Sequence, residues 1–181
     1  MSFHSFQNSL IQLLKIINPE HILELGAGMS SKIMIENSNA LIYSFEESEY
    51  WFHKYSFEIK NERFRIIQSA PGWTYFEKEF DFIFIDSGSR IEVLNKSKEN
   101  LSDKGVIFLH DAHREEYEPG ILLYKYFFFP EKHSCIITDS LDMYLKIKNT
   151  IIPDYSCKCH YCSSPERIEY FNKMITKDFG L

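Results

Sequence analysis

The chain has 181 residues, a length that suits one domain with a single hydrophobic core. Its composition, 44% hydrophobic and 25% charged, is typical of an ordinary globular protein. A formal net charge of −6 argues against a general nucleic-acid-binding protein, which would present a basic face. No apolar run is long enough to span a membrane, and no positive charge precedes the first apolar stretch as in a signal peptide, so we expect a cytoplasmic protein without a membrane or nucleic-acid partner.

Helix-like and strand-like stretches alternate along most of the chain. Ser9 to Ile17 has an amphipathic pattern that stops at Asn18-Pro19. Short apolar runs, typical of buried parallel strands, lie at Ile22–Leu25, Ala40–Phe45, Phe64–Ile67, Phe80–Ile85 and Val106–Leu109. Helices are predicted at Ser30–Asn37, from the N-cap Ser48 through Trp51 and Tyr55, and at Arg90–Leu101, with about one turn near Trp73 to Lys78.

The last third of the chain predicts a helix, a hairpin and a tail. The helix is expected over Glu115–Phe128, and Ser134–Thr138 with Leu141–Ile147 resemble a hairpin around Asp139-Ser140. Strands separated by helices imply right-handed crossovers and a mostly parallel α/β sheet, with the hairpin adding one antiparallel strand at an edge. Residues 1–150 are therefore expected to form the folded domain, and residues 151–181, which lose the periodicity, an irregular cysteine-rich tail.

A glycine-rich turn, Gly26-Ala27-Gly28, follows the first strand, and Ser30 and Ser31 open the next helix. Glycine allows a sharp turn and the close approach of a ligand, and the free N–H groups of the helix face whatever the turn holds. Ser31 replaces the third glycine of the dinucleotide fingerprint, which argues against a nicotinamide cofactor. The turn therefore indicates another nucleotide-like or anionic ligand.

Further candidate residues follow the other strands. Glu46 closes the second strand, where a carboxylate can accept hydrogen bonds from both ribose hydroxyls. A solvated acid at a helix start is the alternative, but the glycine turn in register favours the ribose interpretation. Because ligands bind at the carboxyl ends of strands in open parallel sheets, we expect the site to gather Glu24–Ser31, Glu46, Ser69-Ala70, Asp86–Ser89 and His110–Arg114.

Four stretches, Glu24–Gly28, Ser44–Glu46, Asp81–Asp86 and Lys104–Asp111, together resemble the class I S-adenosylmethionine-dependent methyltransferases. The resemblance covers roughly residues 20 to 148 and implies a doubly wound, Rossmann-like sheet of seven strands in the order 3-2-1-4-5-7-6. It implies S-adenosyl-L-methionine as the cofactor, bound by Glu24, Gly26, Ala27, Gly28, Ser30, Ser31, Glu46, Ser69, Ala70 and Asp86. Glu47 stands where the family often has an apolar residue against the adenine, so Trp51 or Trp73 would have to cover that face.

The stretch His110-Asp111-Ala112-His113-Arg114-Glu115-Glu116 is also similar to the domain found in glucuronoxylan 4-O-methyltransferases, which implies a sugar or uronate acceptor. His110 or Asp111 is the candidate base, since histidine titrates near neutral pH, and Arg114 and Arg90 could hold an anionic acceptor. Asp86 and Asp111 could instead converge on a divalent cation, although Ala112 replaces a ligand that metal-dependent relatives have. Asp86, His110, Asp111 and Arg114 are thus the candidate catalytic residues.

The tail contains Cys157, Cys159, His160 and Cys162, a spacing typical of a zinc knuckle. A complete site would need a further ligand from Cys135, His133 or another subunit; free or redox-active thiols are the alternative. The sequence as a whole predicts an O-methyltransferase acting on a small molecule or a sugar or uronate group. The rival hypothesis is a non-catalytic binding module of the same fold that acts through its tail, with Tyr126–Pro130 as a contact surface; the oligomeric state stays open.

Overall fold

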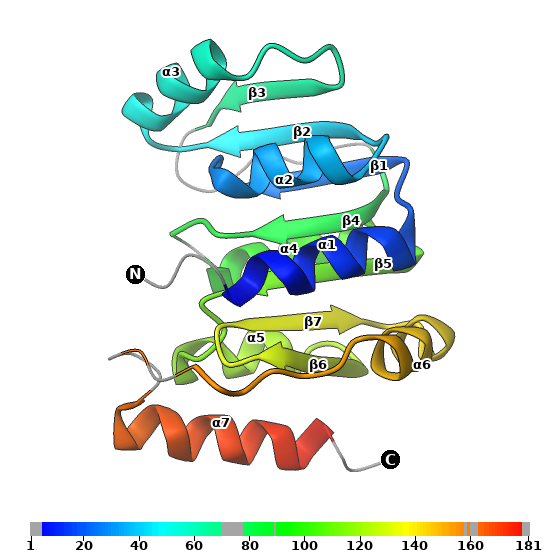
Figure 1. Cartoon of the computed structure of the whole chain (residues 1–181), viewed down its shortest axis with the longest axis vertical. Coiled ribbons are helices and arrows are strands. Elements are labelled where there is room, and N and C mark those ends of the chain that lie inside the picture. The colour runs from blue at the N-terminus through cyan, green and yellow to red at the C-terminus, as the bar shows by residue number, and fades with distance from the viewer. Residues whose placement is uncertain (1–4, 70–77, 89, 158, 160–162, 179–181) are drawn as a thin grey trace.

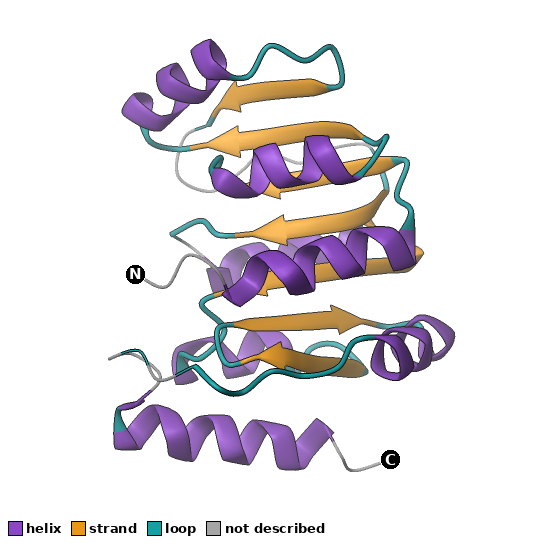
Figure 2. Ribbon diagram, viewed as in Figure 1, coloured by secondary structure: helices purple, strands orange, loops and turns teal. Residues whose placement is uncertain are grey.

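The computed structural model describes residues 5–69, 78–88, 90–157, 159 and 163–178. These residues form a seven-stranded sheet with helices packed on both faces (Figures 1 and 2). The strand order β3-β2-β1-β4-β5-β7-β6 is the order that the methyltransferase resemblance implies. The strands are β1 (His21–Leu25), β2 (Leu41–Glu46), β3 (Phe64–Gln68), β4 (Phe80–Ile85), β5 (Leu101–His110), β6 (Tyr126–Glu131) and β7 (Ser134–Thr138).

A helix precedes β1, and helices also follow β1, β2 and β4. The helices are α1 (Ser5–Ile17), α2 (Met29–Asn37), α3 (Glu49–Glu58), α4 (Arg90–Asn100), the 3-10 turn η1 (Glu115–Tyr117), α5 (Glu118–Ile121), α6 (Leu141–Thr150) and α7 (Pro165–Asp178). Ser48 caps α3 as predicted, because its hydroxyl accepts from the N–H of Trp51. The single turn predicted near Trp73 lies largely outside the described residues.

The sheet is mixed, with one strand reversed. The pairs β1–β2, β1–β4, β2–β3 and β4–β5 are parallel, whereas β7 is antiparallel to both of its neighbours, β5 and β6. The expectation of an antiparallel strand at the edge was therefore wrong: β7 lies inside the sheet and β6 is the edge strand. All parallel strands end at the same side of the sheet, and the loops that follow them meet there.

Two apolar clusters, one on each face of the sheet, hold the layers together. One joins α1, α2 and α6 to residues such as Ile22 and Phe84, and the other joins α4, α5 and α7 to residues such as Leu23 and Ile85. Adjacent strand residues thus belong to opposite faces, as the period of a strand requires. Burial on both faces explains why these strands are apolar without a polar alternation.

Two predictions after residue 114 were wrong. The helix expected over Glu115–Phe128 ends at Ile121, and Tyr126–Glu131 forms strand β6, in which Phe127 and Phe129 face one cluster and Phe128 the other. The second arm of the expected hairpin, Leu141–Ile147, is helix α6. Ser140 caps that helix by accepting from the N–H of Met143, so the hairpin is instead β6–β7.

The sequence predicts an irregular C-terminal segment, but part of this segment is helical. Its last described part is the helix α7, which buries Tyr170, Phe171 and Met174 against the same cluster as β4 and β5. Figure 1 shows α7 beside β6 at the end of the sheet. Within the described part of the chain, no helix combines the length and the apolar character needed to cross a bilayer.

Candidate active site

A cavity of about 830 Å³ opens where the parallel strands end. Most of the predicted site residues line it: Gly26, Ala27, Gly28, Ser30, Glu46, Ser69, Asp86, His110, Asp111 and Arg114. Trp51, one of the two proposed adenine neighbours, lines it too and is 41% exposed. Glu24 and Ser31 are buried and do not line the cavity. Ala70 and Trp73 lie outside the described residues. One hollow therefore joins segments from five strand ends.

The glycine turn is shaped by its neighbour across the sheet. Gly26 has a φ of 98°, and a Cβ added there would lie 2.8 Å from the carbonyl oxygen of Asp86. A side chain is thus excluded both by backbone conformation and by the β4 loop. At Gly28 an added Cβ would meet nothing closer than the Ser30 hydroxyl at 3.8 Å, an ordinary contact, so a side chain fits there. The two glycines therefore have different roles: Gly26 permits the turn, and Gly28 leaves room in the cavity.

Glu24 anchors the turn from below. Its side chain is fully buried and its carboxylate accepts hydrogen bonds from the hydroxyls of Ser30 (2.6 Å), Ser31 (2.7 Å) and Ser44 (2.6 Å). Burial raises the pKa of Glu24 to about 7, although the three hydroxyls act in the opposite direction. Glu24 therefore fixes β1, β2 and the start of α2 relative to one another, and it does so without reaching the cavity.

Glu46 occupies the rim of the cavity at the end of β2. One carboxylate oxygen accepts from the N–H of Ala27 at 2.9 Å and the other from the N–H of Ser48 at 2.7 Å. These two bonds lock the side chain between the glycine turn and α3 in a fixed orientation. Each carboxylate oxygen has a second lone-pair position, so the group retains acceptor capacity for a diol in the cavity.

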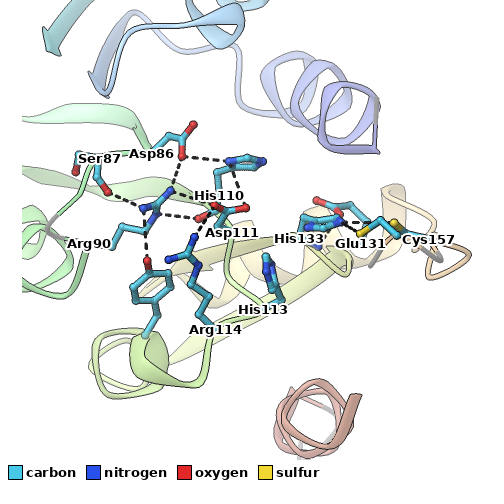
Figure 3. A network of polar contacts seen from close by, with 12 residues as sticks. Asp86, Ser87, Arg90, His110, Asp111, His113, Arg114, Glu131, His133 and Cys157 are labelled. Carbon is cyan, nitrogen blue, oxygen red and sulfur yellow. Dashed lines mark hydrogen bonds and ion pairs between the residues drawn. The ribbon is translucent and has the colours of Figure 1, made fainter. Parts of the chain in front are cut away.

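Arg90 links the ends of β4 and β5 and differs from its predicted role. Its guanidinium donates to the carbonyl oxygens of Ser87 (2.7 Å) and His110 (3.1 Å) and pairs with the carboxylate of Asp86. It also lies 3.6 Å from Asp111 and is only 7% exposed (Figure 3). Because these donors are engaged by the chain and Arg90 does not line the cavity, it positions the two acids rather than an acceptor.

His110 lies between the two acids. Its Nδ1 is 3.2 Å from Oδ1 of Asp86 and 3.9 Å from Oδ1 of Asp111 (Figure 3). Burial by itself would lower the pKa of His110, but the contact with Asp86 and the charge of Asp111 outweigh it, and the pKa lies above its usual value. The ring of Phe6, from α1, packs 4.7 Å from the imidazole. Nδ1 thus faces Asp86, which leaves Nε2 as the nitrogen for another partner.

Asp111 has an unusual backbone. Its φ of 58° lies in the left-handed region, which non-glycine residues adopt mainly where the surroundings impose it. The next residue, Ala112, donates its N–H to the carbonyl of His133, which ties this bend to the β6–β7 turn. Burial would raise the pKa of Asp111, but the charges of His110 and Arg90 hold it below the usual range. Arg114 lies 3.4 Å from the same carboxylate, and its side chain is 42% exposed.

Several cavity residues were not predicted from the sequence. They come from segments without a motif: Phe6 of α1, and Lys54 and Tyr55 of α3. Two histidines also line the cavity: His113, which lies within the predicted segment His110–Arg114, and His133 between β6 and β7, which the sequence offered only as a zinc ligand. The two histidine rings meet edge to face at 4.9 Å. Only a correct assignment of the β6–β7 hairpin would have placed His133 next to the end of β5.

The cysteine-rich segment also reaches the cavity. Cys159 lines the cavity, and the sulfurs of Cys157 and Cys159 lie 3.5 Å and 3.4 Å from Nε2 of His133. Cys135, an alternative ligand in the sequence prediction, is buried in the core. His160 and Cys162 lie outside the described residues, so the predicted ligand set of Cys157, Cys159, His160 and Cys162 stays a prediction.

Comparison with known proteins gives a structural match without a sequence match. No family model matches the chain, and no curated protein is similar to it in sequence. A provisionally assigned O-methyltransferase from Klebsiella pneumoniae superposes with a TM-score of 0.53 at 16% identity, covering 65% of this chain and 61% of that protein. The plantazolicin methyltransferase BpumL, solved with a triazolic desmethylPZN analog and SAH, gives a TM-score of 0.51 at 18% identity. The match covers 98% of this chain and 66% of BpumL.

An O-methyltransferase from Bacillus cereus, solved with SAH, gives a TM-score of 0.50 at 22% identity, covering 60% of this chain and 57% of that one. The chain thus matches about three fifths to two thirds of the length of these proteins. At such low identities the likeness concerns the fold alone. The chain has the fold of the class I S-adenosylmethionine-dependent methyltransferases.

Proposed function

We propose that the protein is an S-adenosylmethionine-dependent methyltransferase that methylates a hydroxyl group of a small molecule or sugar. One observation carries the proposal: a single cavity is lined at one end by the glycine turn and Glu46 and at the other by Asp86, His110 and Asp111. The first set suits a nucleoside with a polar tail, and the second suits the removal of a proton. A cavity of about 830 Å³ is large enough for a cofactor together with a small acceptor.

The residues at the first end fit the cofactor. Gly28 lines the cavity without a side chain, the carboxylate of Glu46 is held in a fixed orientation at the rim, and the exposed indole of Trp51 offers an apolar face. We assign the ribose to Glu46, the methionine part to the turn from Gly26 to Ser30, and the adenine side to Trp51 and Ser69. Glu24 and Ser31 act indirectly by holding that turn.

The bound cofactor supplies a methyl group on a sulfonium sulfur, a donor that is already activated. The chain must therefore hold the acceptor in line and take its proton. We assign the proton to Nε2 of His110, because Nδ1 faces Asp86. Asp86 orients the ring and stabilises its protonated form. Arg114, half-exposed beside Asp111, is available for an anionic group, which keeps a uronate among the candidate acceptors.

We propose that transfer needs no metal ion between Asp86 and Asp111. Those two carboxylates and His110 lie close enough to share an ion, but the Arg90 guanidinium already pairs with Asp86 and lies 3.6 Å from Asp111. It supplies the positive charge that a divalent cation would bring. Activity is therefore expected to stay unchanged when Mg²⁺ or Mn²⁺ is added; strong activation by either ion would overturn this assignment.

The test of the proposed function is cofactor binding, measured by calorimetry with S-adenosylmethionine and S-adenosylhomocysteine. Both should bind the unaltered protein. Glu46→Ala removes two charge-assisted hydrogen bonds to a ribose, worth about 2–4 kcal/mol together, so affinity should fall roughly 30- to 1,000-fold. The matched control is Glu49→Gln, an exposed acid three residues further on that does not line the cavity, and it should change affinity less than about threefold.

Two results would contradict the proposal in different ways. Absence of binding by the unaltered protein at high micromolar ligand would remove the enzyme hypothesis, and unchanged binding by Glu46→Ala would remove the ribose assignment. The acceptor is then sought by incubating the protein and S-adenosylmethionine with panels of uronates, sugars and hydroxylated small molecules. Release of S-adenosylhomocysteine is measured in each case. Binding without turnover on any panel would favour the rival hypothesis, a non-catalytic binding module.

For that rival hypothesis, Tyr126–Pro130 is unsuited as a contact surface, because it forms the largely buried strand β6. A cytoplasmic location remains part of this proposal.

A further inference from the structure

The C-terminal segment is fastened along β6 before it reaches the cavity. The N–H of Asp154 donates to the carbonyl of Pro130 at 2.9 Å, and the hydroxyl of Tyr155 donates to the carbonyl of Phe129 at 2.8 Å. Lys132, in the β6–β7 turn, donates to the carbonyl of Cys157 at 3.0 Å. These bonds use no cysteine side chain, yet they deliver the Cys157 thiol to the same turn that carries His133 (Figure 3).

His133, Cys157 and Cys159 form a compact ligand set. Their ligand atoms all lie within 4.8 Å of one another, and Nε2 of His133 is 3.5 Å and 3.4 Å from the two sulfurs. In a tetrahedral zinc site, Zn–N bonds of about 2.0 Å and Zn–S bonds of about 2.3 Å place nitrogen and sulfur about 3.5 Å apart. The observed separations are therefore those of two edges of a zinc tetrahedron.

Hydrogen bonds alone do not account for this arrangement. A ring nitrogen has either one N–H or one lone pair, so Nε2 of His133 can make one good hydrogen bond and not two. Here two sulfurs lie at nearly equal distances from that one atom. A cation placed between all three atoms satisfies both contacts at once.

We propose that His133, Cys157 and Cys159 bind one zinc ion, which fastens the C-terminal segment to the β6–β7 turn and completes the cavity wall beyond β5. Two thiolates and one imidazole select zinc over hard cations such as Mg²⁺ or Ca²⁺. The fourth position of the tetrahedron is left for water or a further ligand. The structure thus gives the tail cysteines a partner outside the tail, 24 residues before Cys157 in the chain.

The surroundings suit metal binding. His133 is buried, and its Nε2 faces both sulfurs. A competing set of Asp111, His113 and His133 is also compact, but it is a weaker candidate. Nε2 of His113 lies 3.0 Å from Arg167 of α7, and Asp111 is flanked by Arg90 and Arg114. Two of those three groups already face guanidinium groups.

A metal here would shape the cavity. Both His133 and Cys159 line it, next to His113 and Asp111, at the end opposite the glycine turn along the sheet. The ion would add to the hydrogen bonds that Asp154, Tyr155 and Lys132 already make, and it would hold the Cys159 side chain in the cavity wall. The zinc is thus assigned a positioning role at the acceptor end, and the site itself does not depend on whether the protein is a methyltransferase.

The test is the metal content of the full chain, purified without an affinity tag or chelator and measured by mass spectrometry. We expect about one zinc per chain, falling below about one tenth in Cys157→Ser, Cys159→Ser and His133→Gln. Cys135→Ala is the matched control, because Cys135 belongs to the same hairpin but is buried in the core; it should retain the zinc. Cobalt(II) added to the metal-free protein should give thiolate charge-transfer absorption that the double variant Cys157→Ser/Cys159→Ser lacks.

Titration of the metal-free unaltered chain with zinc against a chelating dye keeps the test independent of how the variants fold. Stoichiometric, submicromolar binding supports the site. Three outcomes would overturn it: no zinc and no uptake of zinc, full zinc content in His133→Gln, or a disulfide between Cys157 and Cys159 in the protein as purified. Copper or iron at one ion per chain in place of zinc would overturn the choice of metal.

Discussion

The buried carboxylate of Glu24 makes a quantitative prediction about how stability depends on pH. The pKa of Glu24 is raised from 4.5 to about 7 in the folded chain, mainly by burial, so the folded state holds the proton more tightly than the unfolded state. Stability is therefore lost as pH rises from about 4.5 to about 7. At about 1.4 kcal/mol per pKa unit, the cost at alkaline pH is about 3 kcal/mol.

Replacement by glutamine removes that cost, because the amide keeps the size and an acceptor oxygen but does not ionise. The free energy of unfolding of Glu24→Gln, relative to the unaltered protein, should rise by about 3 kcal/mol between about pH 4.5 and about pH 8. Any constant effect of the amide on the three serine hydroxyls cancels in this difference.

The assay is urea denaturation of both proteins at the two pH values, and Glu47→Gln serves as a control that should show no comparable change. The reasoning would be refuted if the difference in free energy of unfolding between Glu24→Gln and the unaltered protein did not vary with pH. Glu24 would then titrate alike in the folded and unfolded chains.

Two further predictions concern the glycine turn and the base. Gly26→Ala should destabilise the fold by roughly 2–4 kcal/mol through the left-handed strain and the 2.8 Å approach to Asp86, whereas Gly28→Ala should leave the melting temperature unchanged and weaken cofactor binding. Equal melting temperatures of the two variants would contradict this division of roles. With His110 as the base, kcat/KM should rise with pH to a midpoint above the ordinary histidine value of 6.5. Asp86→Asn should move that midpoint downward, because the contact with Asp86 raises the pKa most; a midpoint that stays in place would show that another group is the base.

Much of the cofactor end could be predicted from the sequence, because its geometry is local. The turn at Gly26, the acid at the end of β2 and the cap at Ser48 each depend on a strand end and the few residues after it. Parallel strands end at one side of the sheet, so residues at successive strand ends converge without further information. The structure agrees by lining one cavity with Gly26, Glu46 and Asp86.

Other predictions failed where the local pattern fits two structures. The run Tyr126–Pro130 is apolar throughout and suits a buried helix as well as a buried strand, and only its packing between the two apolar clusters selects β6. Leu141–Ile147 alternates enough to resemble a strand, but the cap at Ser140 and the burial of Tyr144 and Ile147 produce α6. Arg90 likewise resembled an acceptor ligand until its donors proved to be engaged by the chain.

The sequence by itself determined the strand ends and the functional residues that follow them, because turns, caps and buried strands each depend on a few neighbouring residues. Only the tertiary structure decided what lies beside those ends. The ion-pair network of Arg90, the orientation of His110 toward Asp86, and the meeting of His133 with Cys157 and Cys159 join residues from separate elements. Such contacts depend on the order of strands and on the reversal of β7, which are set by packing of the whole sheet and not by any local pattern.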